Sequence, residues 1–161
     1  MNPNKSSNHT SDHAGVAFHP PLLLGLALIL GFLLRWIVPL HFLPNGFPAV
    51  IGPVVVGVAL GFFLWAVYTL VSGGASIPTS KPTDAIVMRG PFRFSRNPIY
   101  LAMVLLQVGV GIWINSLWFI VLAGVSAWLL WWGVISREER YLERKFGNEY
   151  LAYKAKVRRW L

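Results

Sequence analysis

Residues 98–136 read PIYLAMVLLQVGVGIWINSLWFIVLAGVSAWLLWWGVIS and contain no Asp, Glu, Lys or Arg. Two apolar runs, Pro98–Trp113 and Leu117–Ser136, are separated by a polar break at Asn115-Ser116. A straight helix needs about 20 apolar residues to cross the hydrocarbon core of a bilayer, and the first run is short for that. The pattern predicts a tight helical hairpin that enters a membrane from one face and returns to the same face.

Two further apolar runs precede this hairpin. Pro20–Leu40 and Ala49–Val71 are each long enough to cross a bilayer as a helix. The connection between them, His41–Pro48, is short and contains Pro and Gly but no Lys or Arg. The sequence therefore predicts an all-α membrane protein with about four transmembrane helices, of which the last two form the hairpin.

Two features of these first spans allow more than one interpretation. Arg35 lies toward the far end of the first span, beside Trp36. We interpret it as an interfacial side chain whose charge reaches the headgroups, the alternative being an internal polar site. Gly57 and Gly61 in the second span form a small-xxx-small pair suited to close helix packing, within the chain or between copies. The oligomeric state is left open by this pair.

The composition agrees with a membrane protein. Of the 161 residues, 55% are hydrophobic and only 12% are charged, and the charged fraction of soluble domains is about twice as high. The absence of cysteine excludes disulfides and thiolate metal sites. The four His show no metal-ligand spacing, so no metal site is expected.

The basic residues are concentrated in two segments that flank the hairpin. Of the 14 Lys and Arg, four fall between Lys81 and Arg96 and eight between Arg137 and Arg159. Four crossings place both segments and the N-terminus on one side of the membrane, and the positive charge identifies that side as cytoplasmic. We attribute the net charge of +8 to orientation and to attraction by membrane lipids. Nucleic-acid binding is not expected, because no nucleic-acid-binding module accompanies the charge.

The chain divides into a polar N-terminal tail, residues 1–19, and a single membrane domain, residues 20–161, whose cofactor-binding part is about residues 83–161. The tail lacks a basic region followed by a small-residue cleavage site, so we expect a disordered tail and not a cleaved signal peptide. The polar segment 72–96 is longer than a simple connection requires, and loops of this length are often functional.

The C-terminal segment Arg137–Leu161 is charged but periodic. Its apolar residues recur at steps of three and four and so occupy one helical face: Leu142, Phe146, Tyr150, Tyr153, Val157 and Trp160. Gly147-Asn148 interrupts the pattern, with Asn148 able to cap a second helix. We expect a cytoplasmic amphipathic C-terminal segment of two short helices, with its basic residues facing the lipid headgroups.

The motif GPFRFSRNPIY, residues 90–100, marks the start of the hairpin. Asn97 is a favourable N-cap residue and Pro98 is favoured at the first helical position, so a membrane helix is predicted to begin here. The free amides and the dipole of a helix start attract anions, and Tyr100 lies about one turn further along. The plainer alternative is a helix start with interfacial Arg and Tyr anchors.

Glu138 and Glu139 directly follow the last apolar run and its flanking arginine. Carboxylates at a membrane boundary are unfavourable unless they are solvated or paired. Arg137 and Arg140 are candidate neutralising partners, and the functional alternative is a receiver for the ammonium or sulfonium group of a ligand. The hairpin brings Asn97 and Glu138 to the same end, which favours a shared site.

The order of GPFRFSRNPIY, an apolar hairpin and EERYLERKFGNEYLAYKAKV resembles the isoprenylcysteine carboxyl methyltransferase and phospholipid methyltransferase superfamily of integral membrane enzymes. The resemblance covers roughly residues 83–160. The family motif usually reads Arg-His-Pro-x-Tyr, and here Asn97 stands at the His position, which removes a titratable group. The resemblance implies a membrane methyltransferase that uses S-adenosylmethionine and acts on a lipophilic acceptor.

Positions matched to the family also imply roles for individual residues. Those that line the nucleoside side of the cofactor pocket are Ala85, Ile86, Val87 and Phe92. Those that contact the cofactor at the helix start are Asn97, Pro98, Ile99 and Tyr100. Glu138, with Glu139 beside it, receives the cofactor's ammonium group, and the tail closes the pocket. Carboxyl-methylating relatives place a substrate-binding Arg about one turn before the acidic pair; Val134 stands there, and Arg137 is the candidate replacement in catalysis.

Two other functions are kept as alternatives. Sterol-reductase-like membrane enzymes share a similar C-terminal motif set and use a nicotinamide cofactor, but they generally have many more spans. A non-enzymatic lipid-binding membrane protein is the third possibility. The sequence does not identify a residue that binds the methyl acceptor, so the acceptor group could be an amine, a thiol or a carboxylate.

Overall fold

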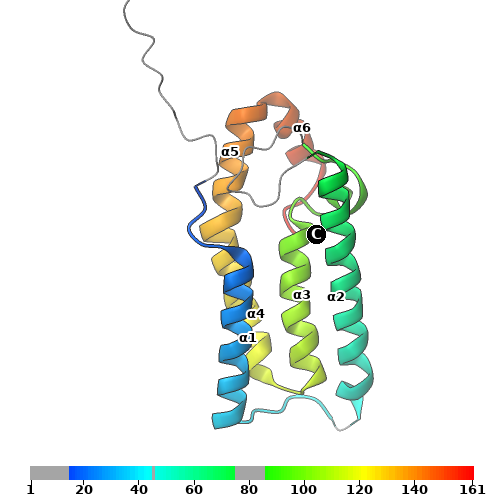
Figure 1. Cartoon of the computed structure of the whole chain (residues 1–161), viewed down its shortest axis with the longest axis vertical. Helices are drawn as coiled ribbons and strands as arrows, with labels where there is room; N and C mark the ends of the chain where they lie inside the picture. The colour runs from blue at the N-terminus through cyan, green and yellow to red at the C-terminus, as the bar shows by residue number, and fades with distance from the viewer. Residues whose placement is uncertain (1–14, 45, 75–85) are drawn as a thin grey trace, which may run out of the picture.

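The structure, a computed structural model, describes residues 15–44, 46–74 and 86–161, and these residues form helices and connecting loops without a strand (Figure 1). The helices are α1 Pro20–Ile37, α2 Phe47–Ser72, α3 Pro98–Trp113, α4 Leu117–Leu130, α5 Ser136–Phe146 and α6 Asn148–Lys156. A 3₁₀ turn, η1 Gly90–Arg93, precedes α3, and a π-helical segment, η2 Trp131–Ile135, joins α4 to α5 without a break.

Within the described residues, three helical stretches are long and apolar enough to cross a membrane: Pro20–Ile37, Phe47–Ser72 and Leu117–Phe146. The fourth apolar helix, α3, has 16 residues and is shorter than the other three. The prediction of an all-helical membrane protein with about four spans and a terminal hairpin is therefore confirmed, with α3 as its short member.

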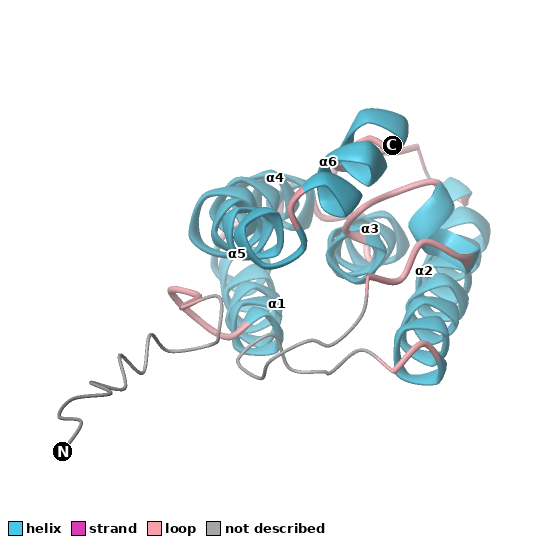
Figure 2. Ribbon diagram, turned by 90° about the horizontal axis from the view of Figure 1, so that it is seen from above, coloured by secondary structure: helices cyan, strands magenta, loops and turns pink. Residues whose placement is uncertain are grey.

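Helix α3 lies at the centre of the bundle, with α2 on one side and α4 on the other (Figures 1 and 2). Glycines permit the close approach of α2 and α3. A Cβ at Gly52 would lie 2.2 Å from the Cα of Trp113, and a Cβ at Gly109 would lie 2.9 Å from the backbone nitrogen of Val56. The pair expected to pack closely, Gly57 and Gly61, has no atom within 4 Å of either Cβ position. That expectation was wrong within the chain, because this side of α2 faces away from α3.

One end of the bundle, which we call the turn end, holds the α1–α2 connection and the α3–α4 turn. Asn115 has a φ of 49° and closes that turn. Its Oδ1 accepts from the backbone nitrogens of Phe42 and Leu43, at 3.0 and 2.9 Å, and its Nδ2 donates to the Leu43 carbonyl at 2.9 Å. Arg35 Nη1 donates to the Asn115 carbonyl at 3.3 Å. Arg35 thus lies at the turn end of α1 and bonds the α3–α4 turn.

The opposite end, which we call the polar end, holds α5, α6 and η1. Here residues 15–19 differ from the expected disordered tail. The Ala17 nitrogen donates to the Gly133 carbonyl at 3.0 Å, and Phe18 packs so closely on Gly133 that a Cβ there would lie 2.4 Å from its ring. Val16 and Phe18 both pack against the buried core. The remainder of the predicted tail, residues 1–14, lies outside the described residues.

The predicted pair of short C-terminal helices is confirmed. Gly147 separates α5 from α6 with a φ of 54° and a ψ of −125°, a conformation that favours glycine. Asn148 was expected to cap the second helix, and that was wrong. It is the first residue of α6, and the capping position belongs to Gly147. Figure 2 shows α6 lying beside α3 at the polar end, in the space between α5 and α2.

Candidate functional site

The segment before α3 is fixed to the end of α2. Arg89 Nη2 donates to the Ser72 carbonyl at 2.7 Å. Gly90 has a φ of 58° and lies so close to Thr69 that a Cβ would be 2.8 Å from its Oγ1. Only glycine meets both conditions without strain. Val87 is buried near Gly73, where a Cβ would lie 2.6 Å from the Val87 Cγ2. The loop therefore has a defined place beside α2.

Helix α3 begins at Pro98, with Asn97 in the N-cap position, as predicted. The expected side-chain cap is absent, however, because Asn97 makes other bonds. Its Nδ2 donates to the carbonyl of Arg159 at 3.1 Å, and its backbone nitrogen donates to Ser95 Oγ at 3.1 Å. Asn97 thus connects the helix start to the C-terminal tail instead of closing the helix on itself.

The C-terminal residues after α6 run along the segment that leads into α3. The Arg96 nitrogen donates to the Arg158 carbonyl at 3.0 Å, and Ser95 Oγ donates to the Arg159 carbonyl at 3.3 Å. Further back, the hydroxyl of Tyr153 in α6 donates to the Phe92 carbonyl at 2.7 Å. Backbone and side-chain bonds therefore hold the tail and the 92–97 segment together as one unit.

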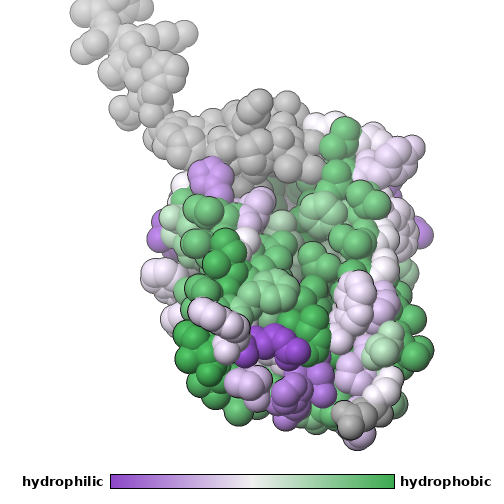
Figure 3. Space-filling view, turned by 60° about the horizontal axis from the view of Figure 1, so that its bottom comes forward, coloured by the Kyte–Doolittle hydropathy of each residue, from purple (hydrophilic) through white to green (hydrophobic). Residues whose placement is uncertain are grey.

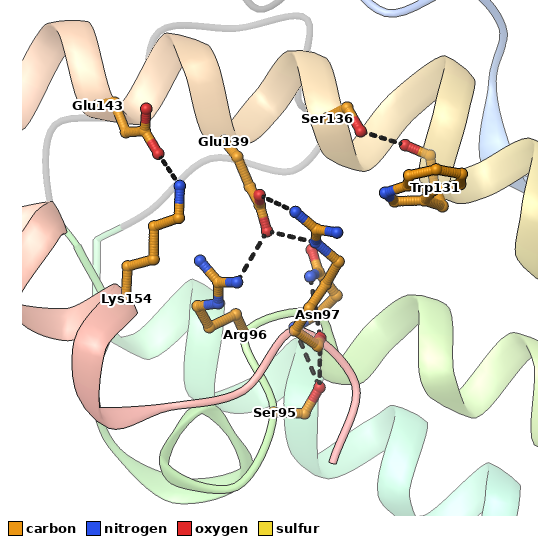
Figure 4. A network of polar contacts seen from close by, with 9 residues as sticks. Ser95, Arg96, Asn97, Trp131, Ser136, Glu139, Glu143 and Lys154 are labelled. Carbon is orange, nitrogen blue, oxygen red and sulfur yellow. Dashed lines mark hydrogen bonds and ion pairs between the residues drawn. The ribbon is translucent and has the colours of Figure 1, made fainter.

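The carboxylate of Glu139 lies between two arginines at the centre of this unit (Figure 4). Arg159 donates through Nε to Oε1 at 3.0 Å and through Nη2 to Oε2 at 2.7 Å, and Arg96 Nη2 lies 3.3 Å from Oε1. Glu139 is only 5% exposed, so water contributes little to its solvation. The two arginines supply the compensating charge, one from the α3 segment and one from the tail.

The partners expected for the acidic pair, Arg137 and Arg140, make other contacts. Arg140 Nε donates to the Ser136 carbonyl at 3.1 Å, and Arg137 Nη1 donates to the Gly15 carbonyl at 3.0 Å. The expectation that they neutralise Glu139 was wrong, because neighbouring residues on a helix point in different directions. The actual partners of Glu139 come from elsewhere in the chain, and local sequence does not indicate them.

Arg96 has unused hydrogen-bonding capacity. Its side chain is 8% exposed, and its Nε and Nη1 have no hydrogen-bond partner among the described residues. A buried guanidinium with unmet N–H groups is costly. Its planar arrangement of donors suits a carboxylate or a phosphate. The two unpaired nitrogens of Arg96 could therefore donate hydrogen bonds to an anionic group at the polar end.

Glu138, one residue before, reaches a different partner. Its Oε1 accepts from the hydroxyl of Tyr100 at 2.7 Å, a contact between α5 and the first turn of α3. Residues 38 apart in the sequence thus meet at the level of the helix start, as the hairpin predicted. Two adjacent carboxylates consequently have separate surroundings: Glu139 lies between arginines, and Glu138 lies beside a tyrosine.

Two buried tyrosines of α6 complete the polar end. Burial, and after it the charge of Glu139, raises the pKa of Tyr150 to about 12. Burial and then the neighbouring Tyr150 raise the pKa of Tyr153. Hydrogen bonding to Glu139 raises the pKa of Arg159. Near neutral pH both tyrosines are therefore neutral, and the Tyr153 hydroxyl is available for its bond to Phe92.

The positions implied by the family resemblance fall around this end. Phe92, Pro98 and Tyr100 are buried, Ile99 packs against the core, and Ile86 is half-buried beside Val87. Ala85 lies outside the described residues. Sequence reasoning missed Arg96 as a buried cation and Arg159 as its counterpart. Arg96 stands within the 90–100 motif, and this position is the signal that could have identified it. Arg159 is one of several arginines in the tail, and nothing in the sequence distinguishes it from the others.

The π-helical segment η2 was also missed. It lies directly before α5, and Ser136 Oγ donates back to the Trp131 carbonyl at 2.7 Å. π-Helical turns often occur at functional sites, because they rotate the residues that follow. Within the described part of the chain, no three His, Asp or Glu side chains form a group that could hold a metal ion.

Comparison with known proteins agrees with this arrangement. The chain is 46% identical over 66 residues to an uncharacterized protein of Haemophilus influenzae, a match that covers 39% of this chain and 100% of the relative. Residues 47–149 match the family model of the phospholipid methyltransferases. The matched region runs from α2 through α5 into the start of α6 and so includes the 90–100 motif, the hairpin and both glutamates. The chain belongs to the phospholipid methyltransferase family, a family of membrane methyltransferases.

Proposed function

We propose that this protein is an S-adenosylmethionine-dependent methyltransferase that acts on a lipophilic acceptor, with its cofactor site at the polar end. The observation that carries the proposal is that a carboxylate and a guanidinium with unpaired donors both lie at the polar end. Glu138 and Tyr100 meet at the start of α3, and Arg96 keeps two buried N–H groups without a partner among the described residues. A site with a carboxylate and unmet guanidinium donors suits a zwitterion, and the amino-acid end of the cofactor is one.

The residues fit the groups of the cofactor. Arg96 would hold its carboxylate through Nε and Nη1, and Glu138 would hold its ammonium group, oriented by Tyr100. The start of α3 from Asn97 to Ile99 supplies further polar contacts. The apolar residues that would line the adenosine are Ala85, Ile86, Val87 and Phe92. The bound cofactor supplies an activated methyl group on its sulfonium.

The protein's own contribution is to position two molecules and exclude water. Glu139 does not reach the ligand in this account. It holds the 92–97 segment and the tail together through Arg96 and Arg159, so that they form two walls of the pocket. Asn97 and Glu138 have binding roles in this proposal, which assigns no residue as a catalytic base. The acceptor would therefore arrive already deprotonated or lose its proton to solvent. Arg137, beside Glu138 on α5, stays our candidate for contact with the acceptor.

Membrane position supports a lipophilic acceptor. The spanning helices expose apolar side chains to lipid, so an acceptor would approach sideways from the bilayer while the polar cofactor enters from water. The basic residues of α5 and α6 support a cytoplasmic polar end, because positive charge is enriched on that side of membranes. A membrane-embedded methyltransferase would serve substrates that leave the bilayer only at high cost.

The direct test is thermal stabilisation of the purified protein by three candidate ligands. We expect S-adenosylhomocysteine to raise the melting temperature, because a ligand that binds only the folded state stabilises it. NADPH at the same concentration should leave it unchanged. Stabilisation by NADPH alone would favour a reductase, and no response to either would favour a lipid-binding protein without this cofactor.

A further inference from the structure

A small cavity lies in the membrane-spanning part of the bundle, below the site at the polar end. It is lined by three residues of α1, by Met103, Val104 and Gln107 of α3, and by Ser126 and Leu130 of α4. Its volume is about 10 Å³, which is roughly the space that one water-sized group needs. Apart from Gln107 and Ser126, every side chain that lines it is apolar.

Gln107 lines this cavity and carries an unmet hydrogen-bond acceptor. The residue is 1% exposed, and its Nε2 donates to Ser126 Oγ at 3.1 Å, while its Oε1 has no hydrogen-bond partner among the described residues. Leaving a buried acceptor unpaired in a membrane is costly, because neither lipid nor water satisfies it there. An apolar residue would pack this position without that cost. The arrangement therefore calls for a donor that the described residues do not supply.

The distance along α3 from the proposed methyl-transfer site to Gln107 indicates which part of a ligand would carry the donor. Tyr100, Met103 and Gln107 are spaced to share one face of α3. Gln107 follows Tyr100 by seven positions along α3, which corresponds to a rise of roughly 10 Å at 1.5 Å per residue. The outer surface of the spanning helices is largely apolar (Figure 3). A lipid lying along α3 would therefore present its reactive group at Tyr100 and a second group near Gln107.

We propose that Gln107 Oε1 accepts a hydrogen bond from a hydroxyl or amide N–H on the body of the methyl acceptor, roughly 10 Å from the atom that is methylated. The inference rests on the proposed methyltransferase function and narrows its substrate class. The acceptor is a lipid with a second, donor-bearing polar group; a plain acyl or prenyl chain without such a donor does not complete the site. Gln107 is a specificity-determining residue and does not take part in the chemistry.

The test uses the full-length protein in nanodiscs with a total membrane lipid extract of the organism that encodes it and S-adenosylmethionine carrying a deuterated methyl group. Mass spectrometry identifies the labelled lipid, and hydrogen exchange in heavy water counts the O–H and N–H groups that it keeps. We expect the product to retain a hydroxyl or amide hydrogen away from the methylated atom. In Gln107→Met, kcat/KM for that lipid should fall about tenfold, the size of one well-placed hydrogen bond.

Matched measurements separate the possible failures. Ser126→Ala removes the partner of Nε2 but keeps Oε1, so this variant should lose stability and keep its preference for the donor-bearing lipid. Binding of S-adenosylhomocysteine should be the same in wild type and Gln107→Met. A labelled product without an exchangeable hydrogen, or a Gln107→Met enzyme as efficient as wild type because water fills the cavity, would overturn the inference alone. No labelled lipid from the wild-type protein would overturn the proposed function with it.

Discussion

The two ends of the bundle are closed in different ways. At the turn end, one neutral amide, Asn115, bonds the backbone at Phe42 and Leu43. At the polar end, charged groups join three segments, with Glu139 between Arg96 and Arg159. Both ends leave buried polar atoms unpaired within the described chain, but these atoms differ in kind.

At the turn end the unpaired atom is the hydroxyl oxygen of Ser116, a neutral group. At the polar end it is part of a guanidinium, Arg96, and leaving charged donors unmet costs far more. A connection between helices needs only partners for its backbone hydrogen-bonding groups. In the proposed function a ligand of opposite charge occupies these donors, and the polar end binds while the turn end only connects helices.

The largest expected effect comes from breaking the charged end. Glu139→Gln leaves Arg96 buried without its counter-charge, and we expect a loss of about 3 kcal/mol in the free energy of unfolding. The matched control is Glu143→Gln, which loses an exposed ion pair with Lys154 and should cost less than about 1 kcal/mol. Thermal melting together with trypsin cleavage of the tail measures both. Equal stability of the two variants would contradict the role assigned to Glu139.

A smaller effect is expected at the turn end. Asn115→Ala loses three hydrogen bonds and puts at a φ of 49° a residue that adopts this conformation less readily than Asn, which should cost about 2 kcal/mol. Asn115→Gly keeps the backbone freedom and should cost roughly half as much. Affinity for S-adenosylhomocysteine, measured by calorimetry, should be unchanged in both. A fall in that affinity would show that the two ends are not independent.

Alkaline pH perturbs the polar end gradually, in part through the buried tyrosines of α6. The pKa of Tyr150 rises from 10.0 to about 12 on folding, so its stabilising contribution is complete below pH 10 and declines between pH 10 and pH 12. The decline approaches about 1.4 kcal/mol per pH unit. Tyr150→Phe should reduce the slope of melting temperature against pH in this window, and the Tyr150→Phe/Tyr153→Phe double variant should reduce it further. An unchanged slope in the double variant would place the titrating groups elsewhere.

Local patterns predicted the elements but not the contacts between distant segments. Long apolar runs gave the spanning helices, Pro98 gave the start of α3, and Gly147 gave the break between α5 and α6, because each depends on its immediate neighbours. The partners of Glu139 depend on how the tail returns to the 92–97 segment, which no local period encodes. The π-helical turn at Trp131–Ile135 likewise lacks a sequence signature of its own.

The candidate site was predicted in the same uneven way. Asn97 and Glu138 could be placed at the same end from the hairpin alone, and the bond between Tyr100 and Glu138 became visible in the structure. Arg96 and Gln107 could not be distinguished in advance, because their significance lies in atoms that packing leaves without partners. Whether a buried donor or acceptor lacks a hydrogen-bond partner depends on the folded structure and can be seen only when all its neighbours are known.

The central claim is that adjacent glutamates have different tasks, with Glu138 facing the ligand and Glu139 holding the walls. Calorimetric titration of S-adenosylhomocysteine into wild type, Glu138→Gln and the matched Arg140→Gln tests it most directly. We expect the affinity of Glu138→Gln to fall at least about tenfold, the loss of one charged contact, with its melting temperature and the Arg140→Gln affinity close to wild type. Absence of binding to the wild-type protein, or an unchanged affinity in Glu138→Gln, would contradict the account.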